Sequence, residues 1–159
     1  MTIDLAPCWP TIVRRAQARI EARREQGNFV SPHSGDAEKA DLLGVAGEWA
    51  WSLATGQRQD ESTLVDLGFD TPDGTNVKAI EHPTHRLVVT PGKLGKAKRF
   101  VLVYVDLPNR LATILGTASR EQVEASPPQD LGHGPRYALW QEELTRFAPP
   151  QVDTPGPRG

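Results

Sequence analysis

One run of residues constrains the fold more than any other part of the chain. The segment FVLVYVDL, residues 100–107, is apolar at nearly every position. A strand with one solvated face alternates apolar and polar residues, whereas a continuous apolar run is typical of a strand covered on both faces. Pro108 and Asn109 form a tight turn after this run, and LATILGT at 111–117 predicts the next strand. The chain is therefore expected to build a sheet with layers on both sides.

Helices are expected before and after the strands. Apolar residues at helical spacing predict helices over 10–26 and 41–54, and Ser119 can cap a short helix at 120–125. Segment 137–147 fits either one helix or a short extended piece followed by a helical turn. The buried stripe expected for the second helix is Leu43, Ala46, Ala50, Leu53 and Ala54. Two helices, four to five successive strands and a short helix predict an α+β fold in which helices flank a mixed central sheet.

The length and composition indicate one domain. The 159 residues are expected to form a single domain over 10–147, after a flexible N-terminus at 1–9 and before a disordered Pro/Gly-rich tail at 148–159. The single Cys8 excludes an internal disulfide and fits a reducing compartment. No apolar run has membrane-spanning length and the N-terminus does not resemble a signal peptide, so we expect a cytoplasmic protein without membrane contact. The net charge of −2 means that nucleic-acid binding would need a local basic patch.

Titratable residues gather around a predicted turn at 71–74. The sequence Thr-Pro-Asp-Gly suits a type I turn, with Pro second and Gly fourth. If the flanking strands pair across this turn, Asp70 lies opposite Asn76 and shares a face with Asn76 and Lys78. Asp66 lies on the same face four residues earlier and is the main rival to Asp70. A solvated hairpin is the plain alternative to a site built from these residues.

The second predicted helix carries an acid among small and aromatic residues. Glu48 follows Gly44 and Gly47 and lies beside Trp49 and Trp51. Such glycines weaken an isolated helix, and small residues three apart usually mean that another element packs against the backbone. Taken alone, a single Glu on a helix is expected to face solvent.

These pieces occur in a recognisable order. A Gly-x-x-Gly-Glu helix at 44–48 is followed by Gly-Phe-Asp at 68–70, by Asn-Val-Lys at 76–78, and by the strands at 86–90 and 100–107. This order is similar to that of the PD-(D/E)xK nuclease superfamily, and in particular to small phage-type members with the restriction-endonuclease-like fold. The resemblance covers about residues 40 to 125. It implies a nuclease that hydrolyses DNA with Mg²⁺ or Mn²⁺, in the host cytoplasm if phage-encoded, and leaves endonuclease or exonuclease action open.

The resemblance also implies roles for four positions. Asp70 would be the central metal ligand, and Glu48 would add a second carboxylate, directly or through water. The backbone carbonyl of Val77 would supply another oxygen, and Lys78 would stabilise developing negative charge or orient the attacking water. Mg²⁺ prefers such oxygen ligands, with waters and phosphate oxygens completing an octahedron.

One position departs from the family pattern. Asn76 stands where the family usually has Asp or Glu, and an amide oxygen can ligate a hard cation without bringing charge. Three interpretations follow: Asp66, Asp73 or Glu81 supplies the missing charge, the enzyme is weak, or the site is inactive. In the last case the fold would be retained to bind nucleic acid or a protein partner. The family also leaves room for a homodimer.

Two basic segments are candidates for phosphate contact. One is the arginine-rich face of the first predicted helix, and the other is the loop after Pro91 and Gly92. A solvated surface is the alternative for both, although arginine forks suit phosphate oxygens. The residues expected to contact DNA are Arg14, Arg15, Arg19, Lys93, Lys96 and Lys98.

Histidine and tryptophan residues give weaker indications. His82 and His85 are spaced like zinc ligands, but Pro83 intervenes and no Cys/His pair follows, which favours a loop. The tryptophans are expected to pack in the interior. Trp140, near a loop end, fits either packing or a stacking surface.

Overall fold

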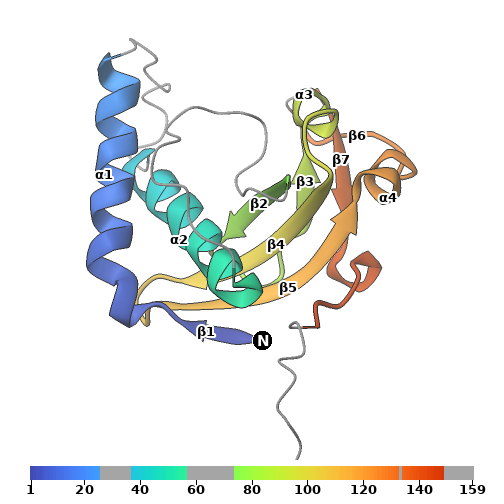
Figure 1. Ribbon diagram of the computed structural model, residues 1–159. Coiled ribbons are helices and arrows are strands. Elements are labelled where there is room, and N and C mark those ends of the chain that lie inside the picture. The colour runs from blue at the N-terminus through green and yellow to red at the C-terminus, as the bar shows by residue number, and fades with distance from the viewer. Residues whose placement is uncertain (26–36, 57–73, 133, 149–159) are drawn as a thin grey trace, which may run out of the picture.

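The computed structural model describes residues 1–25, 37–56, 74–132 and 134–148 (Figure 1). A four-stranded sheet has the strand order β1-β5-β4-β2, and a smaller three-stranded sheet has the order β3-β7-β6. The helices and 3-10 turns are α1 (Trp9–Glu25), α2 (Ala37–Thr55), α3 (Pro91–Leu94), α4 (Arg120–Glu124), η1 (Ala6–Cys8) and η2 (Gln141–Glu143). The strands are β1 (Thr2–Asp4), β2 (Thr75–Ile80), β3 (Leu87–Val89), β4 (Arg99–Asp106), β5 (Leu111–Ser119), β6 (Gln129–Asp130) and β7 (Pro135–Leu139).

Strand β4 is the centre of the larger sheet. It pairs in parallel with β2 and antiparallel with β5, so the sheet is mixed. Alternate side chains of β4 enter different cores: Val101 and Val103 pack with the helices, whereas Phe100 and Leu102 pack with the smaller sheet. Each fully buried side chain of this kind contributes about 1.5 to 3 kcal/mol to folding. The prediction of a strand covered on both faces is confirmed.

The two cores define the layers. Helix α2 lies against the larger sheet and α1 packs against α2, while β3, β7, α3 and α4 lie on the other side (Figure 1). Leu87, Val89 and Val123 are fully buried in the second core. The α+β class, the mixed sheet and the flanking helices follow the prediction, and the small second sheet is an addition to it.

Most elements form where the sequence predicted them. Ser119 caps α4, because its Oγ accepts a hydrogen bond from the backbone N–H of Gln122 at 3.1 Å. Segment 137–147 takes the second of its two predicted forms, with the end of β7 followed by the η2 turn. Helix α2 begins at Ala37, four residues before the predicted start at Asp41.

The prediction of a flexible lead-in at residues 1–9 is wrong. Strand β1 pairs with β5, with Thr2 opposite Thr113 and Asp4 opposite Leu111. Leu5 is fully buried and its backbone N–H donates to the carbonyl of Arg110 at 2.8 Å. A strand of three residues shows no periodicity of its own, so only the pairing with β5 reveals it.

The predicted stripe on α2 is partly wrong. Leu53 is 49% exposed, whereas Trp51 is fully buried. The Trp51 ring packs against Phe147 at 5.1 Å between ring centroids, and the Arg99 guanidinium lies 5.1 Å from the Trp51 ring. Ala46, Ala50 and Ala54 are buried as predicted, so the buried face of α2 differs from the prediction in taking up Trp51 and leaving out Leu53.

Gly116 provides a test of the packing between β5 and the C-terminal segment. A Cβ atom at Gly116 would lie 2.6 Å from Cβ of Leu144 and 3.2 Å from the carbonyl oxygen of Thr145. Gly116→Ala is expected to lower the free energy of unfolding by about 1 to 3 kcal/mol, because backbone must move to relieve the contact. Gly95→Ala is the matched control, since nothing lies within 4 Å of its Cβ position. Urea unfolding measures both, and equal midpoints would contradict this packing.

Candidate functional site

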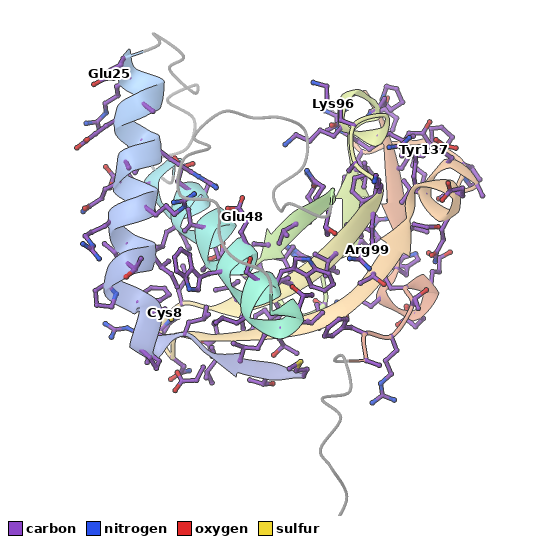
Figure 2. The ribbon with its side chains drawn as sticks, in the orientation of Figure 1. Cys8, Glu25, Glu48, Lys96, Arg99 and Tyr137 are labelled. Atoms are coloured by element: carbon purple, nitrogen blue, oxygen red, sulfur yellow. The ribbon has the colours of Figure 1, made fainter. Side chains whose placement is uncertain are left out.

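The site begins where α2 touches β2. A Cβ atom at Gly47 would lie 2.9 Å from Cβ of Ala79 and 3.3 Å from Cγ1 of Val77, so only glycine allows this approach without a shift. The sequence therefore predicted the close packing correctly. The contact carries Glu48, the next residue, to the strand that holds Asn76, Val77 and Lys78, in the part of α2 between α1 and β2 (Figure 2).

Glu48 is buried and ion-paired. It is 5% exposed, and Arg19 of α1 donates to both of its oxygens, with 3.1 Å between Nη1 and Oε1 and a second bond from Nη2 to Oε2. A buried carboxylate is stable only with such partners. The plain expectation of a solvent-facing glutamate is therefore wrong. Arg19, predicted as a phosphate contact, is directed into the α1–α2 interface in this structure.

Strand β2 presents two different faces. Val77 and Ala79 pack in the core beneath α2, and Asn76 is 1% exposed. Side chains alternate along a strand, so Lys78 and Ile80 point to the opposite side, where they line a cavity. Glu48 and Lys78 are thus brought to the same strand from opposite sides. Asn76 shares the Lys78 face, as the alternation predicted.

The remaining acids of the prediction divide into two groups. Asp66, Asp70 and Asp73 lie outside the described residues, so the pairing of Asp70 with Asn76 stays a prediction. Glu81 is exposed and bound to Lys39 of α2, with 2.6 Å between Nζ and Oε2. The hydrogen bond from Lys39 lowers the pKa of the Glu81 carboxyl. The negative charge of Glu81 is therefore already paired with Lys39 at the surface.

A metal ion would need more than the described donors. Within residues 1–25, 37–56, 74–132 and 134–148, no group of three or more His, Cys, Asp and Glu side chains is arranged to hold a metal. The described oxygens that the resemblance assigned to the metal are the carboxylate of Glu48, the amide of Asn76 and the backbone oxygen of Val77, and Glu48 and Asn76 lie on opposite sides of β2. One carboxylate and two neutral oxygens are a weak set for a hard divalent cation, so a metal ion here would also need a carboxylate from outside the described residues.

The predicted basic residues do not form one patch. Arg14, Lys96 and Lys98 are exposed, whereas Arg15 and Lys93 are half-buried. The Lys98 stem packs over Gly74, with its Cδ 3.3 Å from the Cβ position of that glycine. The arginines belong to α1 and the lysines to α3 and the residues after it, and these helices are well separated in Figure 1.

One feature of this region was missed by the sequence reasoning. Arg86 and Trp140 meet beside Lys78, where they line the same cavity. Neither residue belongs to a motif, and they are far apart in the chain. The only signal in the sequence was the position of Trp140 near a loop end.

Comparisons with protein-family models, with curated proteins and with solved structures find no match. No helix in the described parts of the chain is long and apolar enough to cross a membrane.

The Arg19–Glu48 pair gives a prediction about stability. Arg19→Met removes the cation that contacts both oxygens of a buried carboxylate, and is expected to cost on the order of 3 kcal/mol. Arg19→Met with Glu48→Leu should recover much of that loss, because two apolar side chains replace a desolvated pair. Glu81→Gln, which breaks the exposed pair with Lys39, is the control and should change stability much less. Urea unfolding of the three variants and of wild type tests this, and an unchanged free energy of unfolding in Arg19→Met would contradict it.

Proposed function

We propose that this protein is a metal-dependent nuclease that hydrolyses DNA phosphodiester bonds, with Glu48, Asp70 and Lys78 at its centre. One observation carries the proposal: Glu48 is a buried carboxylate at the point where α2 touches the strand of Asn76, Val77 and Lys78. Burying a charge is costly, and packing alone does not require one here. An acid on the helix that packs against this strand supports the proposal, because the resemblance assigns a metal ligand to that helix.

The chemistry assigns each group a role. Mg²⁺ or Mn²⁺ would polarise the scissile phosphate and lower the pKa of the attacking water. Asp70 would be the central ligand, with Asp66 as the alternative, and the Val77 carbonyl would add an oxygen. Because Glu48 and the Asn76 amide approach β2 from opposite sides, one of the two would act through a bridging water and not as a direct ligand. The Lys78 ammonium would stabilise the negative charge that develops on the phosphate.

DNA contact outside this centre would come from exposed cations. Arg14, Lys96 and Lys98 are exposed and suited to phosphate oxygens. Arg19 would contribute only indirectly, by holding Glu48 in place. A homodimer or a protein partner is compatible with this function and is not required by it.

A second function, binding without cleavage, is supported by a different observation. Arg19 engages both oxygens of Glu48, and Asn76 lacks the charge of the family's acid. For Glu48 to ligate a metal ion, at least one of its bonds to Arg19 would have to be exchanged. In a catalytically degenerate protein this pair would serve only to join α1 to α2, and the fold would bind nucleic acid or a protein without cleaving it.

Cleavage assays separate the two functions. Wild type is expected to cleave DNA with Mg²⁺ or Mn²⁺, tested on circular duplex, linear duplex and single-stranded substrates. Asp70→Asn and Lys78→Met should each lower the rate by about 100-fold or more, because each removes a charge that acts on the reacting phosphate. Glu124→Gln, an exposed substitution on α4, is the control and should cleave normally. Absence of cleavage by wild type on every substrate, or unaltered rates in both site variants, would contradict the nuclease.

Position 76 gives a test that does not depend on catalysis. Asn76→Asp restores the family's acid at a residue that is 1% exposed. Without metal the buried charge should lower Tm, and Mn²⁺ should raise the Tm of this variant more than that of wild type. Gln17→Glu makes the same amide-to-acid change on the exposed side of α1 and should show no added response. Equal Mn²⁺ shifts in Asn76→Asp and wild type would argue against a metal site here.

A further inference from the structure

A cavity of about 550 Å³ opens beside Lys78. Its polar lining includes Lys78, Arg86 and the imidazole of His85, and its apolar lining includes Ile80, Val88 and the indole of Trp140. None of the described residues that line it is acidic. The volume lies within the range of about 300 to 1,000 Å³ that is usual for small-molecule sites. The cavity therefore combines positive charge with an aromatic surface.

The aromatic surface is created by strand register. Leu87 of β3 pairs with Leu139 of β7 in an antiparallel ladder, so the next pair outward is Arg86 and Trp140. The Arg86 guanidinium lies over the indole, 4.5 Å from the ring centroid. Trp140 is nevertheless 53% exposed, so much of the indole remains open to a ligand.

The walls of the cavity are tied together before any ligand binds. The side-chain amide of Gln141 donates to the carbonyl oxygens of Pro83 at 2.6 Å and of His85 at 2.9 Å. The backbone N–H of Trp140 donates to Oε2 of Glu143 at 2.7 Å. The two Gln141 bonds join η2 to the turn between β2 and β3, which carries His85 and leads to Arg86, and the Trp140 bond holds the start of η2. An ordered site loses less entropy on binding than a loose one.

We propose that this cavity is a subsite for an unpaired nucleotide of a DNA strand, whose base stacks on Trp140 and whose phosphate is bound by Arg86 and Lys78. Stacking on an exposed aromatic ring tolerates every base, and adjacent cations track the backbone. A paired base in a duplex is covered on both faces by its neighbours and cannot present a face to Trp140. The assignment of the bound strand as substrate rests on the proposed nuclease, because Lys78 belongs to both sites, and it makes single-stranded DNA the preferred substrate form.

Binding without cleavage tests the subsite. Fluorescence anisotropy with a labelled single-stranded oligonucleotide of mixed sequence, in EDTA, should give a lower Kd than the same sequence as a duplex. Trp140→Ala should raise the single-strand Kd by about five-fold or more, because one stacking contact is lost. Trp140→Phe should retain most of the affinity, since a phenyl ring still stacks. Trp140 is exposed, so both variants are expected to fold, and circular dichroism checks this.

The phosphate contact is tested by salt dependence. Arg86→Gln should weaken binding and reduce the slope of log Kd against log salt concentration by about one contact. The chain offers a matched control, because Arg110 lies over Trp9 in the same kind of pair, 5.5 Å from the ring centroid. Arg110→Asn removes that guanidinium, and asparagine tolerates the positive φ of 55° at this residue. Its Kd and slope should match those of wild type.

Several results would overturn the subsite. Among the variants, these are an unchanged Kd in Trp140→Ala, or equal losses of affinity in Arg86→Gln and Arg110→Asn. Among the ligands, these are tighter binding to duplex DNA or to RNA of the same sequence. Full displacement of the oligonucleotide by a free mononucleotide at a similar concentration would also overturn it. Trp140-dependent binding with no cleavage in Mg²⁺ or Mn²⁺ would support the subsite and reject the nuclease. Asp70-dependent cleavage with no effect of Trp140→Ala on binding would support the nuclease and reject the subsite.

Discussion

The burial of β4 on both faces is the constraint on which the rest of the structure depends. Val101, Val103 and Val105 enter the core beneath the helices, while Phe100 and Leu102 enter the core beneath the smaller sheet. This central strand therefore contributes to both layers, as its neighbours β5 and β2 also do. Because apolar burial is proportional to the area removed from water, an interruption of this strand would weaken both layers together. The parallel pairing of β2 with β4 then sets where the candidate site lies.

Strand β2 connects two chemical environments. On its α2 side, Gly47 allows a backbone contact that brings a buried acid close, and Arg19 balances the charge of that acid. On its other side, Lys78 enters a cavity that has cations and an aromatic ring and no described acid. The acid and the cations therefore lie on opposite sides of one strand.

Local patterns in the sequence predicted most of the elements because those patterns reflect local physics. Helical spacing located α1 and α2, the apolar run located β4, and Ser119 capped α4 as expected. Predictions that depended on distant partners succeeded less often. Residues 1–9 gave no sign of β1, since a strand of three residues is stabilised by β5 and not by its own sequence. Leu53 was placed in the core because its spacing fits, but it is exposed in the structure, where Trp51 is buried instead.

The sequence by itself determined the α+β class, the double burial of β4, and the close approach at Gly47, because each follows from residue type and spacing along a short segment. Only the tertiary structure decided the two pairings on which the functional proposals rest. Arg19 meets Glu48 because α1 and α2 pack side by side, and the sequence placed that arginine on a basic surface instead. Arg86 meets Trp140 because Leu87 pairs with Leu139, and no local pattern specifies the register between strands so far apart in the chain.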